Sequence, residues 1–312
     1  KSYTFKGERK LSVSDNLSLG YGSDYNYNNG NFKVHGNWGS SAEGHSDNLG
    51  LFTNLGYNLN DTTILSSHLR GDKHKYSEEN LTYRVNATKL FNNFTLSLSE
   101  STGLRYPDLY VLHGSNPSGS FKSMKTTKPE TSLTRELYVK YNLSDVISLE
   151  STAYKGSVSD VLNRGTSTNG YNEIIDIEQE GLENSFILKD DNQRLILSST
   201  LSKSREGNGR PQLRRPEKQF GINYTKKIIS NFFGPFDLKY DYRHIGKVED
   251  WKNGSVRSKV DSSDIMNLSL SKKLSKQIWS LNIFNLTDEV YQRPDTYNQE
   301  RRRISLSFNH RY

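Results

Sequence analysis

The sequence has no cysteine, only 2 methionines and 7 prolines, and no long hydrophobic run. The absence of cysteine excludes disulfide frameworks, thiolate metal sites and cysteine nucleophiles. No window approaches the roughly 18 consecutive apolar residues of a membrane-spanning helix, so a helical membrane protein is excluded. The chain starts with KSYTFKGE, which lacks the basic start and apolar core of a secretory signal, so an exported protein is expected to be mature or truncated here.

Hydrophobic residues are also scarce, at 32% of the 312 residues, whereas globular domains contain about 45–50% apolar residues. Disorder does not explain this composition, because disordered chains are poor in aromatic residues and this chain has 11% aromatics, including 19 tyrosines. The composition therefore predicts an ordered protein that does not depend on a large apolar core.

Apolar and polar residues alternate along the chain, and no 3.6-residue period persists long enough to predict a helix. In residues 236–243 one face is apolar and the other is fully charged, because successive strand side chains point to opposite sides. Such runs, with their turn signals, predict about 15 strands. The predicted strands lie near residues 2–9, 16–25, 47–59, 62–72, 80–91, 94–105, 132–142, 146–158, 173–189, 193–204, 217–228, 235–247, 262–273, 276–286 and 301–312.

The connections between the predicted strands alternate between short Asn/Asp/Ser turns and long polar loops. With antiparallel strands, this alternation places all the long loops at one end. The long loops are expected at residues 26–46, 106–131, 159–172, 205–216, 248–261 and 287–300.

Composition separates the architectures that accept many alternating strands. A soluble sandwich or propeller buries its apolar face and needs more apolar residues than this chain has. A transmembrane barrel turns its apolar face to lipid and its polar face to a wet lumen, so half of each strand can be polar. Alternating connection lengths and aromatic residues near strand ends are typical of the same class. We therefore predict an all-β, antiparallel transmembrane β-barrel surrounded by outer-membrane lipid.

The last predicted strand is amphipathic and ends on an aromatic residue. Ile304, Leu306, Phe308 and Tyr312 share one face with His310. The segment resembles the C-terminal signal by which bacterial outer-membrane barrels are recognised for assembly, except that His310 stands where an apolar or aromatic residue is usual. The barrel-assembly machinery is therefore an expected partner, and the alternative is an amphipathic strand without this role.

Two basic groups, Arg301–Arg303 and residues 210–218, are predicted at the long-loop end. Contact of Arg301, Arg302 and Arg303 with lipopolysaccharide phosphates through charge-assisted hydrogen bonds is one interpretation, and a solvated rim is the other. Nucleic-acid binding is not expected, because the net charge of +7 is spread over many strands and interleaved with Asp and Glu. No metal-ligand spacing and no nucleotide-binding or hydrolase motif occurs, so no enzyme, metal or cofactor is predicted.

Five segments carry a resemblance to a known family. They are GLRYPDLYVLHG (103–114), KPETS (128–132), LRRPEKQFGINY (213–224), YRHIGKVEDW (242–251) and SLNIFNLTDEVYQ (280–292). Their motifs, in the same order, resemble TonB-dependent outer-membrane receptors, most closely the cobalamin-receptor branch. One departure is Glu289, which stands where the family commonly has Lys.

The resemblance implies a barrel of about 22 strands around a plug, of which this chain would supply about 15. Residues 1–312 would be the C-terminal portion of a receptor-like barrel that is truncated at its N-terminus, without the plug and TonB box. The implied function is uptake of a scarce nutrient such as cobalamin, powered by the TonB system through the plug, in the outer membrane of a Gram-negative bacterium. A siderophore receptor of the same fold, a passive porin and a soluble all-β binding protein remain alternatives.

The resemblance also implies that the outer loops form the wall of a vestibule for a small-molecule nutrient. The candidates for ligand contact are Tyr106, Tyr110, Tyr171, Trp251, Tyr291 and Tyr297. For Tyr106 and Tyr291, the alternative role is the outer aromatic girdle. The charged residues expected to face the lumen and the plug are Arg84, Glu136, Lys140, Asp237, Lys239, Asp241 and Arg243.

Overall fold

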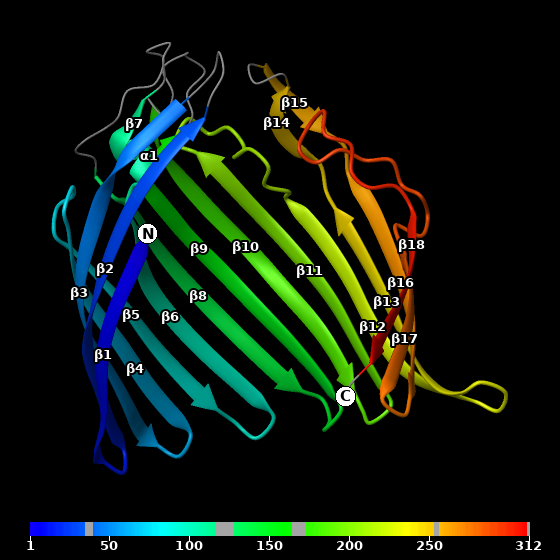
Figure 1. The fold of residues 1–312 in the computed structure, drawn as a ribbon. Coiled ribbons are helices and arrows are strands. Elements are labelled where there is room, and N and C mark those ends of the chain that lie inside the picture. Colours follow the sequence, from blue (N-terminus) through cyan, green and yellow to red (C-terminus); the bar gives the residue numbers. More distant parts are fainter. Residues whose placement is uncertain (35–39, 116–127, 164–172, 253–255, 311–312) are drawn as a thin grey trace.

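The computed structural model describes residues 1–34, 40–115, 128–163, 173–252 and 256–310. Fifteen strands form one antiparallel sheet in which every strand pairs with the next strand of the series (Figure 1). In sheet order they are β1 (Ser2–Ser14), β2 (Leu17–Val34), β3 (Ser40–Asn60), β4 (Thr63–His74), β5 (Asn80–Leu90), β6 (Phe94–Arg105), β8 (Glu130–Asn142), β9 (Ile147–Asn163), β10 (Glu173–Lys189), β11 (Gln193–Glu206), β12 (Lys218–Ser230), β13 (Gly234–Ile245), β16 (Ser263–Leu274), β17 (Gln277–Phe284) and β18 (Arg303–His310). This arrangement confirms the prediction of about 15 antiparallel strands.

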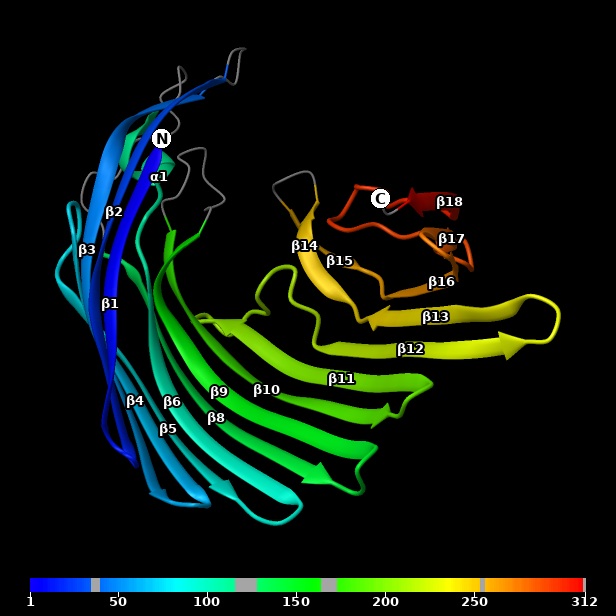
Figure 2. The same cartoon turned by 60° about the horizontal axis from the view of Figure 1, so that its bottom comes forward.

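The remaining elements lie at the long-loop end of the sheet. They are the helix α1 (Leu109–His113), the short strand β7 (Gly114–Ser115), which pairs with β3, and the two-stranded sheet β14 (Val248–Lys252) and β15 (Val256–Val260). Figure 2 shows α1 and the β14–β15 hairpin at the same end of the molecule. The short turns lie at the opposite end, as the alternating connection lengths predict.

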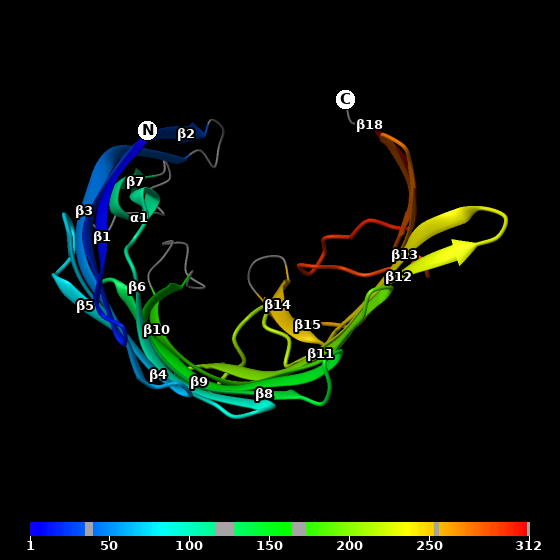
Figure 3. The same ribbon diagram turned by 90° about the horizontal axis from the view of Figure 1, so that it is seen from below.

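The sheet is curved, and α1, β14 and β15 lie on its concave side (Figure 3). Among the described residues β1 pairs only with β2 and β18 only with β17, so the sheet is open between these two edges. Each edge leaves a row of backbone donors and acceptors without ladder partners.

The register assigns the two faces of the sheet. Gly30 on β2 and Gly44 on β3 are cross-strand partners, and both face α1. A Cβ atom added at Gly30 would lie 3.0 Å from Leu109, and one added at Gly44 would lie 2.4 Å from His113. Even-numbered residues of β2 and β3 therefore face the concave side. Leu51 points the other way and is 59% exposed. The convex face is apolar and the concave face is polar.

The molecule has no ordinary hydrophobic core in its described parts. The buried hydrophobic side chains there are Ala42, Val111, Leu112, Ile177, Val248 and Val260. Most other large apolar side chains lie on the exposed convex face. This distribution explains how an ordered sheet forms with few hydrophobic residues. No helix within the described ranges is long and apolar enough to cross a membrane.

Three predicted loops were partly wrong. Much of 26–46 is strand, because β2 and β3 pair from Leu17 and Tyr57 as far as Val34 and Ser40. Asn and Gly are poor strand formers, so propensity ended these strands too early. Within 106–131, α1 is only five residues long, too short to show a helical period. Within 248–261, β14 and β15 are likewise five residues each.

A close backbone approach at Gly22 yields a test of the register. A Cβ at Gly22 would lie 2.4 Å from the carbonyl oxygen of Gly7, whereas a Cβ at Gly7 would meet nothing within 4 Å. We expect Gly22→Ala to lower the free energy of unfolding by about 1–3 kcal/mol through overpacking. Gly7→Ala is the matched control and should leave it unchanged or slightly raised. Urea unfolding in detergent measures both, and equal effects would contradict this register.

Candidate functional site

The first polar cluster on the concave side lies between β2 and β4. Arg70 on β4 binds two carboxylates, with 2.6 Å from Nη1 to Asp24 Oδ2 and 2.7 Å from Nε to Asp72 Oδ2. Asn48 on β3 donates to Asp72 at 2.8 Å. Asp72 is buried, and the fork of the Arg70 guanidinium supplies the paired donors that a buried carboxylate requires. The cluster joins three strands where the sheet approaches α1.

The segment that leads into the helix α1 lies beside this cluster. The Asp108 carboxylate accepts from the amide of Val111 at 2.9 Å and caps the helix, while Val111 and Leu112 are buried. Tyr106, just before the helix, stacks on His74 with ring centroids 4.3 Å apart. Burial raises the pKa of Tyr106, and the nearby Asp72 carboxylate adds to that rise. Tyr106 is therefore a neutral phenol in the wall of the concave side.

The second polar cluster centres on Asp250 of β14, whose side chain is fully buried. Its carboxylate accepts from Arg214 Nε at 2.7 Å, from the amide of Trp251 at 2.7 Å and from the amide of Asp295 at 2.8 Å. The amide of Arg214 in turn donates to the Glu249 carbonyl at 2.8 Å. Asp250 thus joins the 206–217 loop, the β14–β15 hairpin and the 287–300 loop.

The pKa of Asp250 reflects two opposing causes. Burial raises it, but the hydrogen bonds from Arg214 and from the amides of Asp295 and Trp251 outweigh burial and hold it below the ordinary value. The carboxylate is therefore charged at neutral pH. A buried charge of this kind is tolerated only when it is paired and hydrogen-bonded.

Arg257 on β15 extends the second cluster. Its guanidinium lies 2.5 Å from Glu206 and 3.4 Å from Glu249, and donates to the Pro211 carbonyl at 2.9 Å. Arg257 also lies over the Trp251 ring, 5.5 Å from its centroid. The cluster is held by charge pairs and presents an aromatic surface at the same end as α1.

The predicted ligand-contact residues divide between the two clusters. Tyr106 and Tyr110 belong to α1 and its approach, and Tyr110 meets Phe32 edge to face at 6.2 Å. Trp251 lies on β14, and Tyr291 and Tyr297 lie in the loop that Asp295 joins to it. Tyr297 is 66% exposed, whereas Tyr291 is half-buried. Tyr171 lies outside the described residues.

The register places all seven predicted lumen-facing charges on the concave face. Arg84 is the cross-strand partner of His68, Glu136 accepts from Ser99 at 3.1 Å, and Lys140 pairs with Glu150 at 3.1 Å. The other four form one face of β13, where Asn267 donates to Asp241 at 3.3 Å. Their contact with a plug stays a prediction.

The arginines predicted to contact lipopolysaccharide have partners within the chain. Arg301 forms a two-point pair with Asp288 at 2.9 and 2.6 Å, and the amide of Arg302 donates to the same carboxylate. Arg303 pairs with Glu300 at 2.7 Å and lies 4.2 Å from the Phe284 ring centroid. These pairs fix the loop before β18. Contact with phosphate would have to compete with them.

The terminal strand carries the predicted assembly residues. Ile304, Leu306 and Phe308 lie on the convex face of β18, opposite Ile283, Leu281 and Trp279 of β17. Tyr312 lies outside the described residues. Recognition by the assembly machinery stays a prediction.

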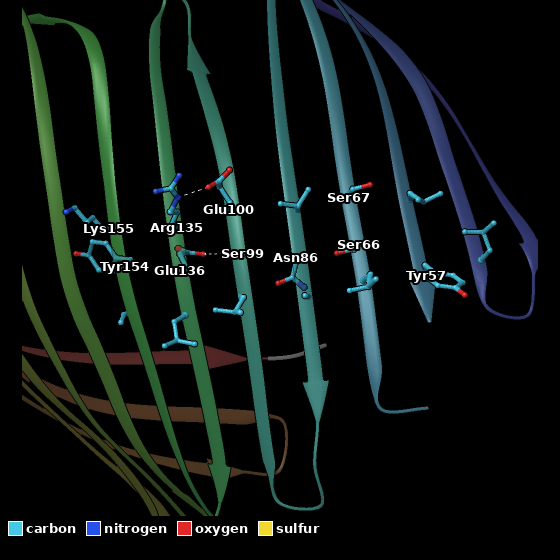
Figure 4. A pocket seen from close by; sticks show the side chains of 18 residues that line it. Tyr57, Ser66, Ser67, Asn86, Ser99, Glu100, Arg135, Glu136, Tyr154 and Lys155 are labelled. Atoms are coloured by element: carbon cyan, nitrogen blue, oxygen red, sulfur yellow. Dashed lines mark hydrogen bonds and ion pairs between the residues drawn. The ribbon is translucent and has the colours of Figure 1, made fainter. Parts of the chain in front are cut away.

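A hollow of about 900 Å³ lies on the convex face, away from the two polar clusters. Its floor is apolar, with Val85, Leu98 and Leu137 on neighbouring strands, and Figure 4 shows the Glu100–Arg135 pair at its edge. A surface of this chemistry suits acyl chains better than a polar nutrient. Among the described residues, no group of three His, Cys, Asp or Glu side chains is placed to bind a metal ion.

Sequence reasoning missed the carboxylates that organise the two clusters. Arg214 lies 36 residues before Asp250. Arg70 lies two residues before Asp72 on β4, but its second carboxylate, Asp24, is 46 residues away on β2. A basic segment containing Arg214 was visible, but the sequence carried no sign of its carboxylate partner. Only the fold brings Asp24 to Arg70 and Arg214 to Asp250.

The Asp250 cluster yields a test. Asp250→Asn replaces one acceptor oxygen with a donor, so the amides of Trp251 and Asp295 should exchange with deuterium about tenfold faster or more, which corresponds to about 1.4 kcal/mol. In the unaltered chain the protection is present above the ordinary carboxyl pKa of 3.8 and is lost as the pH falls through the lower value of Asp250. Asp261→Asn, at an exposed pair with Lys247, is the control and should change neither amide. Unchanged exchange in Asp250→Asn would contradict its role.

No curated protein matches the sequence. Solved structures that resemble the chain include the siderophore receptor PirA from Acinetobacter baumannii (TM-score 0.78, 15% identity, 99% of this chain and 54% of that chain). They also include the FrpB iron transporter from Neisseria meningitidis, F5-1 variant (0.76, 13%, 99% and 55%), and the ferripyoverdine receptor of Pseudomonas aeruginosa (0.73, 13%, 98% and 47%).

At these identities the likeness shows the fold alone, and the chain spans about half the length of the solved structures. The family model for the TonB dependent receptor-like beta-barrel matches residues 2–286. This match covers most of the open sheet, the Arg70 cluster and Asp250 with Arg214. The chain therefore belongs to the TonB-dependent receptor-like β-barrel family.

Proposed function

We propose that the chain is the C-terminal barrel portion of a TonB-dependent receptor that takes up a ferric chelate across the outer membrane of a Gram-negative bacterium. The observation that carries the proposal is the family match over residues 2–286, together with two aromatic and charged clusters on the concave side at the long-loop end. The span of about half of the solved receptors supports the view that a plug and further strands complete the working protein.

The ligand is inferred from names and charge. PirA is described as a siderophore receptor, and the ferripyoverdine receptor was solved with ferripyoverdine bound. A net charge of +7 suits an anionic ferric chelate. Cobalamin is the second candidate, because the segments LRRPEKQFGINY and SLNIFNLTDEVYQ resemble the cobalamin-receptor branch.

In this proposal the two clusters form opposite parts of the vestibule wall. Exposed aromatic side chains such as Tyr297 contact the ligand, while Asp250 and Arg70 hold the loops and strands that carry them. The charged concave faces of β8 and β13 border the plug. TonB, pulling on the plug with energy from the inner membrane, then opens the path through the lumen.

Two other classes fit less well. A soluble binding protein conflicts with the exposed apolar convex face, which needs a lipid or protein cover. A passive porin needs no plug, so the gene upstream of Lys1 separates the two membrane functions. A plug and TonB box there support the receptor, and a signal peptide joined directly to the barrel supports the porin.

The proposal predicts a growth phenotype. Deleting the gene should abolish growth on a ferric siderophore as sole iron source and leave growth under cobalamin limitation unchanged.

Tyr297→Ala in the intact gene should weaken ligand binding about tenfold, because exposed aromatic anchors carry much of the binding energy at such surfaces. Val290→Ala, in the same loop and equally exposed at 66%, is the matched control. A growth defect only under cobalamin limitation would contradict the ferric-chelate assignment and identify cobalamin as the ligand.

A further inference from the structure

The β12–β13 hairpin projects beyond the rest of the sheet. Pairing of β12 with β11 ends at Lys226, and pairing of β13 with β16 ends at Asp237. Beyond these points, residues 228–236 pair only with each other within the described sheet. Figures 1 and 3 show this hairpin extending outward, away from the concave side.

The projecting tip is apolar on both faces. Ile228 pairs with Phe236 on one face, and Ile229 pairs with Pro235 on the other. Exposures are 75% for Ile229, 87% for Phe232 and 63% for Phe233. Other short turns at this end are mostly Asn, Asp and Ser, so this tip differs from its neighbours.

The turn holds its aromatic rings in place. Ser230 Oγ accepts from the amides of Phe232 and Phe233 at 3.2 and 3.1 Å, which satisfies these two backbone donors. The two rings meet edge to face with centroids 4.9 Å apart. Because the backbone donors are satisfied internally, the tip can enter an apolar medium without leaving these amides unpaired.

Lysines and further aromatic rings surround the tip on the convex face. Trp279 and Phe308 pack against each other, 4.8 Å apart, on the same face. Lys226 is exposed at the base of the projecting hairpin. Lys272 lies opposite Trp279 and donates to the Phe233 carbonyl. The nearby Asp190 carboxylate is occupied by the amides of Asn192 and Gln193 at 2.8 and 2.9 Å.

We propose that residues 228–236 form a lipid anchor that inserts into the headgroup boundary of the periplasmic leaflet, where Lys226 and Lys272 bind the phosphate of an anionic phospholipid. The inference rests on family membership, which gives the convex face to lipid and the short turns to the periplasm. A lipid occupant fits because the tip points outward and continues the aromatic convex face, and because long lysine side chains reach headgroups from an apolar surface. A periplasmic protein partner would instead be expected to dock on a tip that points along the barrel axis.

The lack of cysteine allows a direct depth measurement. Phe232→Cys and Asp191→Cys, in the adjoining β10–β11 turn, are labelled separately with a nitroxide in the full chain. The chain is placed in phosphatidylcholine vesicles with or without phosphatidylglycerol. We expect the label at position 232 to collide with a water-soluble nickel chelate about threefold less often than the label at 191, since the tip lies among lipid.

The headgroup contact has its own variant. Lys226→Gln combined with Lys272→Gln should abolish any extra shielding of position 232 that phosphatidylglycerol provides. Lys33→Gln combined with Lys252→Gln, two exposed lysines at the long-loop end, is the control and should leave it intact.

Three results would overturn the proposal. If the labels at 191 and 232 are equally accessible to the nickel chelate, whether both are exposed to water or both are shielded, residues 228–236 are not a lipid anchor. Shielding in native outer-membrane fragments but not in pure lipid would assign the tip to a protein partner. If phosphatidylglycerol still increases the shielding of position 232 in the Lys226→Gln, Lys272→Gln variant, these lysines do not bind the lipid phosphate. Failure of the ferric-chelate assignment would leave all three readouts unaffected, because none involves a nutrient.

Discussion

The two-residue period of the strands, fixed by an unbroken antiparallel ladder, is the constraint on which the rest of the structure depends. Within residues 236–243 of β13 it sends the apolar side chains to one face and the charged side chains to the other. Because the ladder satisfies the backbone, the sheet needs no large core, and the convex face can remain apolar and exposed. The scarcity of hydrophobic residues follows from this arrangement.

The loop end obeys a different rule. There the chain no longer forms the hydrogen bonds of the main sheet, and buried carboxylates hold its segments together instead. Asp72 joins β3 and β4 near Tyr106, and Asp250 joins two loops to β14. Each carboxylate is fully supplied with donors, which is the condition for keeping a charge buried. In the proposed vestibule, the exposed aromatic side chains depend on these two carboxylates for their positions.

Strand alternation is a local property, and it was predictable. The alternation in residues 236–243 predicts β13 and its two faces, and similar alternating runs predict the number of strands. The outer halves of β2 and β3 could not be predicted, because the stretch around Asn26–Asn31 is rich in Asn and Gly, which have low strand propensity. These residues are strands because β2 and β3 pair with each other there. The helix α1 and the β14–β15 hairpin are too short to show a period. The role of Asp250 could not be predicted for another reason: its partners Arg214 and Asp295 come from two loops that only the fold brings to β14.

The central claim is that the convex face of this sheet contacts lipid and the concave face contacts water. Single cysteines placed in turn at positions 236 to 243 of β13, in the full chain in phospholipid vesicles, test it with a water-soluble thiol reagent. The account predicts reaction at 237, 239, 241 and 243 and protection at 236, 238, 240 and 242. Reactivity without a two-residue period, or with the opposite phase, would contradict it.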